Sequence, residues 1–465
     1  MNLRKVLLIP ALLIVLIGSF FSCGVDRWPE YAKQTELDMW IYDTMNQNYL
    51  WYQDMPAYDK VNLFLSPTEF LSKIISKKDN GYSFVDSVLD APLPSYGFDY
   101  SLVRNTEIDT AYNALITYII PGSPAEKAGL KRGEWIMKVN NAYISQKYEK
   151  KLLQGVTPVS LTIGTYQKIE PEPGDEEEGD IYDVIPSRNG VQMGAAVPLE
   201  DSPIHTYDIL TLTDGSKIGY LMYNSFTAGT TQAPDKYNNE LLRISNEFKN
   251  ANIQALVLDI RYNKGGTIAC AQLLGTMLAP SAYLNQTMAF LEFNDKNINK
   301  DATLTFDSKL LQGGSNLNLN TVIVLTSSIT AGAPEMLMHC LNGKTQRSIN
   351  IGATTKGQNI ATERFVNSDY RWALNPVVCT IYDSEHVTQQ GGFKATYSVS
   401  ESSDYTKFLP FGDPNELLLS TAIGFLEGTY PPNSTTKVQK KTSIQPVKSV
   451  SSPASRHFVG GLRIN

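Results

Sequence analysis

The stretch Leu258-Asp259-Ile260-Arg261-Tyr262-Asn263-Lys264-Gly265-Gly266 decides the fold. The apolar run that leads into it predicts a buried strand, and the glycine pair permits a tight turn where that strand ends. Similar apolar runs predict further strands, and amphipathic segments predict helices between them. The expected strands are 219–223, 253–259 and 322–326, and the expected helices are 237–249 and 334–341. Strands alternating with helices indicate a mixed α/β core.

The chain has 465 residues, enough for about three domains, and its composition changes along its length. We expect an α/β and α+β multidomain protein with a helical N-terminal module, a β domain and an α/β core. The parts are a signal peptide at 1–23, the helical module at 24–90, the β domain at 91–170, an acidic loop and linker at 171–200, the core at 201–432 and a disordered tail at 433–465. The helical module depends on apolar residues at helical spacing, namely Leu37, Trp40, Ile41, Met45 and Tyr49. The tail is expected to be disordered because it is rich in Ser, Thr and Lys.

Composition excludes several classes of function. The chain carries 40 basic and 47 acidic residues, so it lacks the basic surface that nucleic acids require. No cysteine has the spacing of a metal site, and the acidic run 170–180 lacks the spacing of a calcium loop, so we expect no metal and no cofactor. Cys270, Cys340 and Cys379 stand in apolar surroundings, and we expect buried thiols, with one disulfide as the alternative.

The N-terminus predicts export from the cytoplasm. Arg4 and Lys5 precede an apolar run at 6–21 that is shorter than a membrane span and typical of a signal peptide. Ser22-Cys23-Gly24 at its end resembles a bacterial lipobox, which implies lipidation of Cys23 and attachment to a membrane. The alternative is an uncleaved N-terminal anchor. Both interpretations place the rest of the chain in the cell envelope, facing the periplasm or the cell surface.

Residues 122–136, which read GSPAEKAGLKRGEWI, resemble the GSPAxxAGLxxGD segment of a PDZ domain. Ser123 is expected to cap a short helix that begins at a proline. Upstream, Tyr96, Gly97 and Phe98 resemble the loop with which such domains hold a terminal carboxylate while a peptide adds as a strand. The resemblance implies a polypeptide partner that is bound through its C-terminus.

Residues 258–266 in turn resemble the DLRxNxGG segment of the C-terminal processing, or tail-specific, serine peptidases. That family also places a PDZ domain ahead of its peptidase core. The resemblance implies that Gly265 and Gly266, with the N–H of Ala333, form an oxyanion hole that stabilises developing negative charge. It also implies that Asp259 and Arg261 form a structural pair at this turn.

The family mechanism uses a serine nucleophile and a lysine base, and both positions are substituted in this chain. The segment 325–335 resembles the nucleophile motif TSSxTASASE, and its alignment puts Gly332 at the serine position. The segment 351–359 resembles the base motif IGxTTxGK, and its alignment puts Gln358 at the lysine position. Glycine has no side chain that could attack, and an amide is not basic enough to accept the proton.

Three interpretations of this double substitution remain open. The first is a non-catalytic member of the family that binds unstructured polypeptide through the PDZ domain and the cleft. The second is an active endopeptidase with a displaced pair, in which Ser327 or Ser328 attacks and Lys356 is the base. Those serines precede the expected position by four or five residues, and small misplacements already cost large factors in rate. The third is a non-enzymatic scaffold of the cell envelope.

Overall fold

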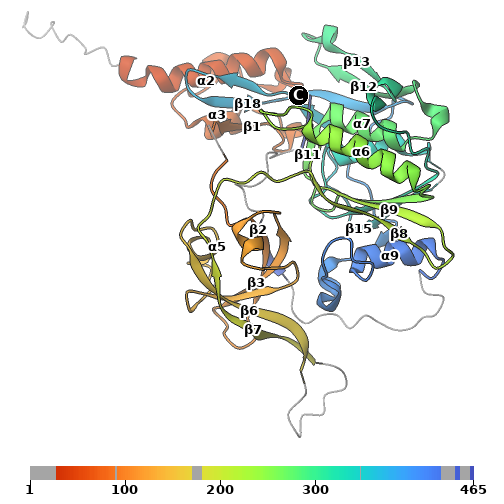
Figure 1. Ribbon diagram of the computed structural model, residues 1–465. Helices are drawn as coiled ribbons and strands as arrows, with labels where there is room; N and C mark the ends of the chain where they lie inside the picture. The colour runs from red at the N-terminus through yellow and green to blue at the C-terminus, as the bar shows by residue number, and fades with distance from the viewer. Residues whose placement is uncertain are drawn as a thin grey trace, which may run out of the picture.

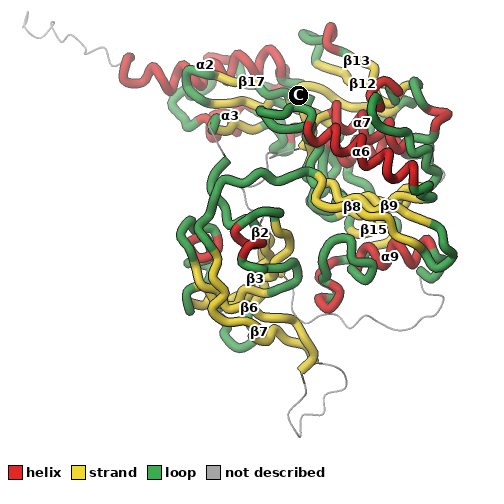
Figure 2. Tube along the Cα trace, in the orientation of Figure 1, coloured by secondary structure: helices red, strands yellow, loops and turns green. Residues whose placement is uncertain are grey.

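The computed structural model describes residues 28–89, 92–169, 181–345, 347–430, 446–450 and 461–464. The expected signal peptide with Cys23 and the acidic run 170–180 lie outside the described residues. Within the described ranges, no helix combines the length and the apolar character that crossing a membrane demands. Figures 1 and 2 show an N-terminal helical module, a separate β domain and a larger α/β core.

The N-terminal module is built on two helices, α2 (Trp28–Asn48) and α3 (Pro67–Ile74). The predicted helical spacing is confirmed, because α2 buries Leu37, Ile41 and Met45. The module also contains a strand: β1 (Phe84–Ser87) pairs with β18 (Trp372–Asn375), which pairs with β17 (Phe365–Asn367). The apolar cluster of the module includes Ile360 of the core, so the module packs against the core at this residue.

The β domain is an antiparallel sheet in the order β21-β2-β3-β4-β6-β7, with β5 beside β4. Its strands are β2 (Phe98–Arg104), β3 (Tyr112–Ile119), β4 (Trp135–Val139), β5 (Ala142–Tyr143), β6 (Val159–Ile169), β7 (Ile181–Met193) and β21 (Pro446–Val450), and its helices are α4 (Pro124–Lys127) and α5 (Glu149–Leu153). The domain end expected at residue 170 is wrong, because β6 and β7 pair as a hairpin with Ile169 opposite Ile181. The charged run 170–180 separates the two strands in the sequence, and for that reason composition predicts a domain end before it.

The core is built on a six-stranded sheet in the order β20-β15-β14-β10-β9-β8, parallel except for β8. Its strands are β8 (Ile204–Thr211), β9 (Lys217–Tyr223), β10 (Ala255–Asp259), β14 (Thr321–Thr326), β15 (Arg347–Gly352) and β20 (Tyr397–Ser398). Its helices are α6 (Lys236–Asn250), α7 (Ile268–Leu278), α8 (Ala333–Leu341) and α9 (Leu417–Leu426). Alternate residues of β10 face opposite clusters: Leu256 and Leu258 pack with α6, α7 and α8, whereas Val257 packs with α9. Figure 1 shows α6 and α9 on opposite sides of this sheet.

A second six-stranded sheet in the core has the order β11-β22-β16-β19-β12-β13. Its strands are β11 (Gly265–Thr267), β22 (Gly461–Arg463), β16 (Ile360–Thr362), β19 (Val377–Asp383), β12 (Thr287–Phe293) and β13 (Ala302–Thr305). Short 3-10 helices connect the larger elements at Tyr52–Asp54, Tyr58–Lys60, Lys77–Asp79, Ser281–Tyr283, Ile298–Lys300, Ser308–Leu311, Glu401–Ser403 and Tyr405–Lys407.

The prediction of a wholly disordered tail is wrong for two of its segments. Residues 446–450 form β21 at the edge of the β domain, and residues 461–463 form β22 inside the second sheet of the core. Each strand obtains its hydrogen bonds from residues that are remote in sequence, so composition alone gives no sign of it. The tail therefore contacts both domains.

Candidate active site

Gly332, at the aligned nucleophile position, is buried and caps the N-terminus of α8. Its backbone has φ +70° and ψ −111°, a conformation that glycine adopts readily and that strains other residues. The residue that follows, Ala333, opens the helix and is also buried, close to the helix start predicted at residue 334. The structure thus has a helix N-terminus at the expected place, without a side chain that could attack.

Gln358, at the aligned base position, lies in the same site as Gly332. Its side chain is only 3% exposed, and Nε2 donates to the Ile360 carbonyl at 3.1 Å. Its Oε1 is buried without a hydrogen-bond partner among the described residues. The two aligned positions are joined by one carboxylate oxygen, because the backbone N–H groups of Gly332 and Gln358 both donate to Oε2 of Glu335, at 3.0 and 2.8 Å.

Glu335 is therefore the residue that organises this site. Its other oxygen, Oε1, accepts from the Thr355 hydroxyl at 2.5 Å and from the Gly357 N–H at 2.6 Å. Four donors and the positive end of α8 compensate a carboxylate that is 3% exposed. The catalytic motifs alone assign no role to Glu335, although a glutamate three residues after a helix cap is a recognisable signal.

The expected oxyanion-hole glycines, Gly265 and Gly266, belong to β11, which follows the turn after β10. Gly266 has φ +141°, and a Cβ there would lie 2.3 Å from the carbonyl oxygen of Phe226, so that only glycine fits. The N–H of Gly265 donates to Oδ1 of Asn263 at 3.0 Å, while the carbonyl of Asn263 accepts from the N–H of Ala331 at 3.2 Å. Asn263 thus ties the glycine strand to the turn before α8.

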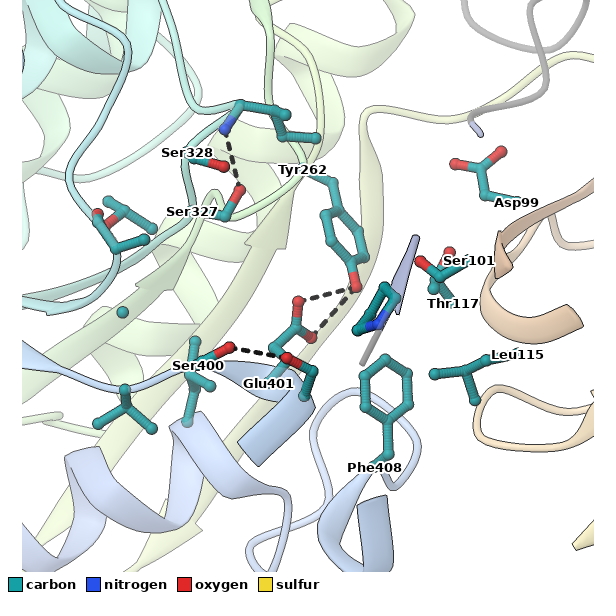
Figure 3. Close-up of a pocket in the computed structure, with 18 of the residues that line it drawn as sticks. Asp99, Ser101, Leu115, Thr117, Tyr262, Ser327, Ser328, Ser400, Glu401 and Phe408 are labelled. Carbon is teal, nitrogen blue, oxygen red and sulfur yellow. Dashed lines mark hydrogen bonds between the residues drawn. The ribbon is translucent and has the colours of Figure 1, made fainter. Parts of the chain in front are cut away.

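The candidates for a displaced pair make contacts with different parts of the molecule. The Ser327 hydroxyl donates to the backbone carbonyl of Arg261, and Ser328 is exposed. Both serines line a cavity of about 350 Å³ between the β domain and the core, together with Tyr262 (Figure 3). The Lys356 ammonium instead lies 4.9 Å from the centre of the Tyr82 ring in the N-terminal module. None of these contacts brings a serine hydroxyl to the lysine.

Residues 96–98, the segment predicted to hold a terminal carboxylate, lie at the start of β2. The side chains of Tyr96 and Phe98 are buried in the core of the domain. Gly97 has φ +86°, and a Cβ there would lie 2.2 Å from Cβ of Ser123. Ser123 in turn accepts from the N–H of Glu126 at 3.1 Å, which confirms the predicted helix cap. The loop is therefore shaped by close packing on the α4 segment.

Buried charges connect the turn at 259–261 with the β domain. The Arg261 guanidinium donates to both oxygens of Asp259, at 2.9 and 2.7 Å, and to Oε1 of Glu416 at 2.7 Å, so the expected structural pair is present. Burial raises the pKa of Glu416, but the charge and hydrogen bonds of Arg261, the charge of Arg132 and the N–H of Leu419 together outweigh burial and hold that pKa below its ordinary value. Arg132 of the β domain reaches the same cluster through Glu401 at 2.5 Å.

The three cysteines of the core are buried free thiols, so the alternative of a disulfide is wrong. Burial raises the pKa of Cys340 and of Cys379 to about 12. Both thiols therefore stay protonated near neutral pH, and a buried protonated thiol is a poor nucleophile.

Comparisons with known proteins agree with this architecture. Residues 217–399 match the profile of peptidase family S41, residues 36–84 match the S41 N-terminal domain, and residues 115–164 match the PDZ domain. A carboxyl-terminal-processing protease of Picosynechococcus sp. is 21% identical in an alignment of 383 positions that covers 76% of this chain and 80% of that protein. A crystal structure from Bacteroides fragilis assigned to the S41 proteases is 45% identical and superposes with a TM-score of 0.79, covering 84% of this chain and 97% of the other. The chain, with its N-terminal module, its PDZ domain and its peptidase core, belongs to peptidase family S41.

Proposed function

We propose that this protein binds unstructured polypeptide through its PDZ domain and its peptidase cleft and does not hydrolyse it. The observation that carries the proposal is the pairing of Gly332 with Gln358 on the carboxylate of Glu335. The positions that would supply nucleophile and base are adjacent in space, yet one has no side chain and the other has an amide. The backbone arrangement around Glu335 is that of a site whose two reacting side chains are replaced.

What remains in the cleft can still bind a peptide. The N-terminus of α8 presents N–H groups without carbonyl partners in the helix, and its dipole favours a carbonyl or a carboxylate. The edges of β11 and β16 can bond an added strand, as their pairing with β22 of the chain's own tail illustrates. These features support binding that is not followed by a chemical step.

The test compares cleavage and binding of one probe, fluorescein-labelled reduced and carboxymethylated α-lactalbumin. We expect the native protein to bind this probe without cutting it, and the double variant Gly332→Ser, Gln358→Lys to gain cleavage. The matched control is Gly343→Ser, Gln358→Lys, because Gly343 has φ +71°, nearly the same as Gly332, but lies in open space. Cleavage by the native protein that survives Ser327→Ala and Ser328→Ala and resists serine-directed inhibitors would overturn the proposal.

The displaced pair of Ser328 with Lys356 is the competing proposal. A fluorophosphonate reagent that labels Ser327 or Ser328 of the native chain, with loss of labelling in Lys356→Ala, would favour it. We expect no labelling, because Ser327 is engaged with a backbone carbonyl and Lys356 lies against Tyr82. A chain that does not cut the probe, and does not bind it even at about millimolar probe concentration, would favour the scaffold interpretation.

We also propose that the protein is exported and attached to a bacterial membrane through a lipid on Cys23. The support is the sequence at 4–24, a basic start, an apolar run and a cysteine after a small residue. Metabolic labelling with a palmitate analogue should mark the native chain and not Cys23→Ala. Equal labelling of both chains, or a native chain recovered from the cytoplasm, would contradict this proposal.

A further inference from the structure

The end of the chain occupies the peptidase cleft as a strand. β22 lies between β11 and β16 and runs parallel to both, so it fills a slot that is one strand wide. The N–H of Gly461 donates to the Lys264 carbonyl, and the N–H of Ile464 donates to the Thr362 carbonyl, both at 2.9 Å. The tail therefore uses the hydrogen-bonding edges that an incoming peptide strand would need.

The tail also passes between Gly332 and Gln358, the positions aligned with the nucleophile and the base. A Cβ on Gly332 would lie 2.6 Å from the carbonyl carbon of Gly461 and 2.6 Å from the nitrogen of Leu462. A Cβ on Gly461 would lie 2.3 Å from both terminal atoms of the Gln358 side chain. The peptide bond between Gly461 and Leu462 is thus held between the two substituted positions, and glycine at 332 and at 461 makes this approach sterically allowed.

The same tail covers the edge of the PDZ sheet. β21 runs antiparallel to β2, with Val450 opposite Tyr100 and Pro446 opposite Val103. The Lys448 ammonium lies 2.7 Å from Oε2 of Glu149 on α5. A peptide that adds to β2 as a strand would require the edge that β21 now covers.

We propose that residues 446–450 and 461–464 are the resident ligand of both grooves, and that external polypeptide binds only when this tail leaves. The inference rests on the proposed function, since it names what regulates polypeptide binding at the same grooves. A segment tethered to its own site acts at an effective concentration of about a millimolar, so micromolar external peptide competes poorly with it.

The test releases the tail from the cleft in the full-length chain. Leu462 is completely buried, so Leu462→Lys places a charge in an apolar pocket and should unseat β22. The matched control is Leu89→Lys, because Leu89 is 55% exposed. The probe is a fluorescein-labelled synthetic peptide with the sequence of residues 456–465, and its affinity is measured by fluorescence anisotropy.

We expect Leu462→Lys to bind this peptide at least about tenfold more tightly than the native chain and the control do. Equal affinity in all three proteins would overturn the inference. Labelled carboxymethylated α-lactalbumin separates the two proposals. If Leu462→Lys binds the tail peptide but not this denatured protein, the inference of a resident tail is supported and the proposed binding of unstructured polypeptide is wrong.

A second measurement uses the native chain alone and does not depend on the folding of the variant. Amide hydrogens of 461–464 should be protected from exchange, and saturating tail peptide should raise their exchange rate at least about fivefold as it displaces the tail. Exchange of 461–464 at the rate of an unfolded peptide, without any ligand, would overturn the inference.

Discussion

The two ends of the tail lie in two grooves that hold a strand by different means. In the cleft, β22 is bonded on both sides and its Leu462 is completely buried within the main apolar cluster of the core. At the PDZ edge, β21 is bonded on one side, its Val447 is half exposed, and Lys448 makes an ion pair at the surface. Both grooves hold their segment by backbone hydrogen bonds, to which the cleft adds burial of an apolar side chain and the PDZ edge adds an ion pair.

This difference indicates an order of release. An edge strand with exposed side chains opens at low free energy, whereas a central strand with a buried leucine opens only with part of the core. External polypeptide should therefore displace β21 from the PDZ edge first and β22 from the cleft second. The changes that follow perturb one groove and leave the other as an internal reference.

Gly332→Ala should have the largest effect, and only on the cleft. The added methyl would lie 2.6 Å from the backbone of the tail and would hold a strained φ of +70°. We expect a loss of about 4 kcal/mol in the free energy of unfolding, from strain and from the displaced tail together. Denaturant unfolding gives the loss, and hydrogen exchange should show 461–464 deprotected while 446–450 is unchanged.

The control for this change is Gly343→Ala. Gly343 has φ +71° and nothing within 4 Å of an added Cβ, so it reproduces the strain without the collision. We expect this control to lose about 1 kcal/mol and to keep 461–464 protected. Similar losses in both variants would mean that the tail does not lie against Gly332.

Leu462→Ala should rank second. Truncation of a fully buried leucine leaves a cavity and costs about 3 kcal/mol, if the surroundings relax only in part. Its counterpart at the PDZ edge, Val447→Ala, should change stability by about 0.5 kcal/mol or less, because Val447 is 50% exposed. Denaturant unfolding of the two variants measures the contrast directly, and equal losses would remove the distinction between the grooves.

The sequence was informative where a segment carries its own pattern. The strands 255–259 and 321–326 and the helix 236–250 follow from apolar runs and spacing within each segment. The pairing of Gly332 with Gln358 also followed from motif spacing, and the structure brings both to one carboxylate.

The strands of the tail could not be predicted in this way. β22 has only three residues, and its partners are Gly265–Thr267 and Ile360–Thr362, remote in sequence from the tail. It is stabilised as a strand by hydrogen bonds to β11 and β16, which lie together only in the folded core. Local propensity therefore does not predict it. The ties that Glu335 makes to residues 355–358 are likewise visible only after folding.

A third change tests a pH dependence that originates in the N-terminal module. Asp38 on α2 is completely buried, neither carboxylate oxygen has a hydrogen-bond partner among the described residues, and burial raises its pKa to about 7. The folded state therefore keeps a proton that the unfolded state loses above its ordinary pKa of 3.8. The resulting penalty on stability grows as pH rises from about 4 to 7 and is complete above 7.

Asp38→Asn should remove this penalty. We expect the variant to gain on the order of 2 kcal/mol over the native chain at pH 8 and little at pH 4, since relaxation reduces the full linkage value. The module packs behind Ile360, which belongs to the strand beside β22, so protection of 461–464 at pH 8 should rise as well. A gain that is the same at both pH values would show that Asp38 is not the titrating group.

Glu149→Gln should have a smaller effect than Gly332→Ala, Leu462→Ala and Asp38→Asn, and it should act at the PDZ edge alone. Glu149 accepts from the Tyr100 hydroxyl at 2.7 Å and pairs with Lys448 at 2.7 Å. Glutamine can keep the bond to Tyr100 but loses the attraction to the ammonium, so exchange of 446–450 should rise by about fivefold, equivalent to about 1 kcal/mol.

Salt should act on the native chain as this variant does, because the Lys448 side chain is half exposed and added ions screen its attraction. The matched control is Glu240→Gln, which breaks a surface ion pair with Arg243 on α6 and should leave both tail segments unchanged. The segment 461–464 is held by backbone hydrogen bonds and by the buried Leu462, so salt should change its exchange less than that of 446–450. If salt releases both segments together, the tail leaves as one unit and the order of release inferred from burial is wrong.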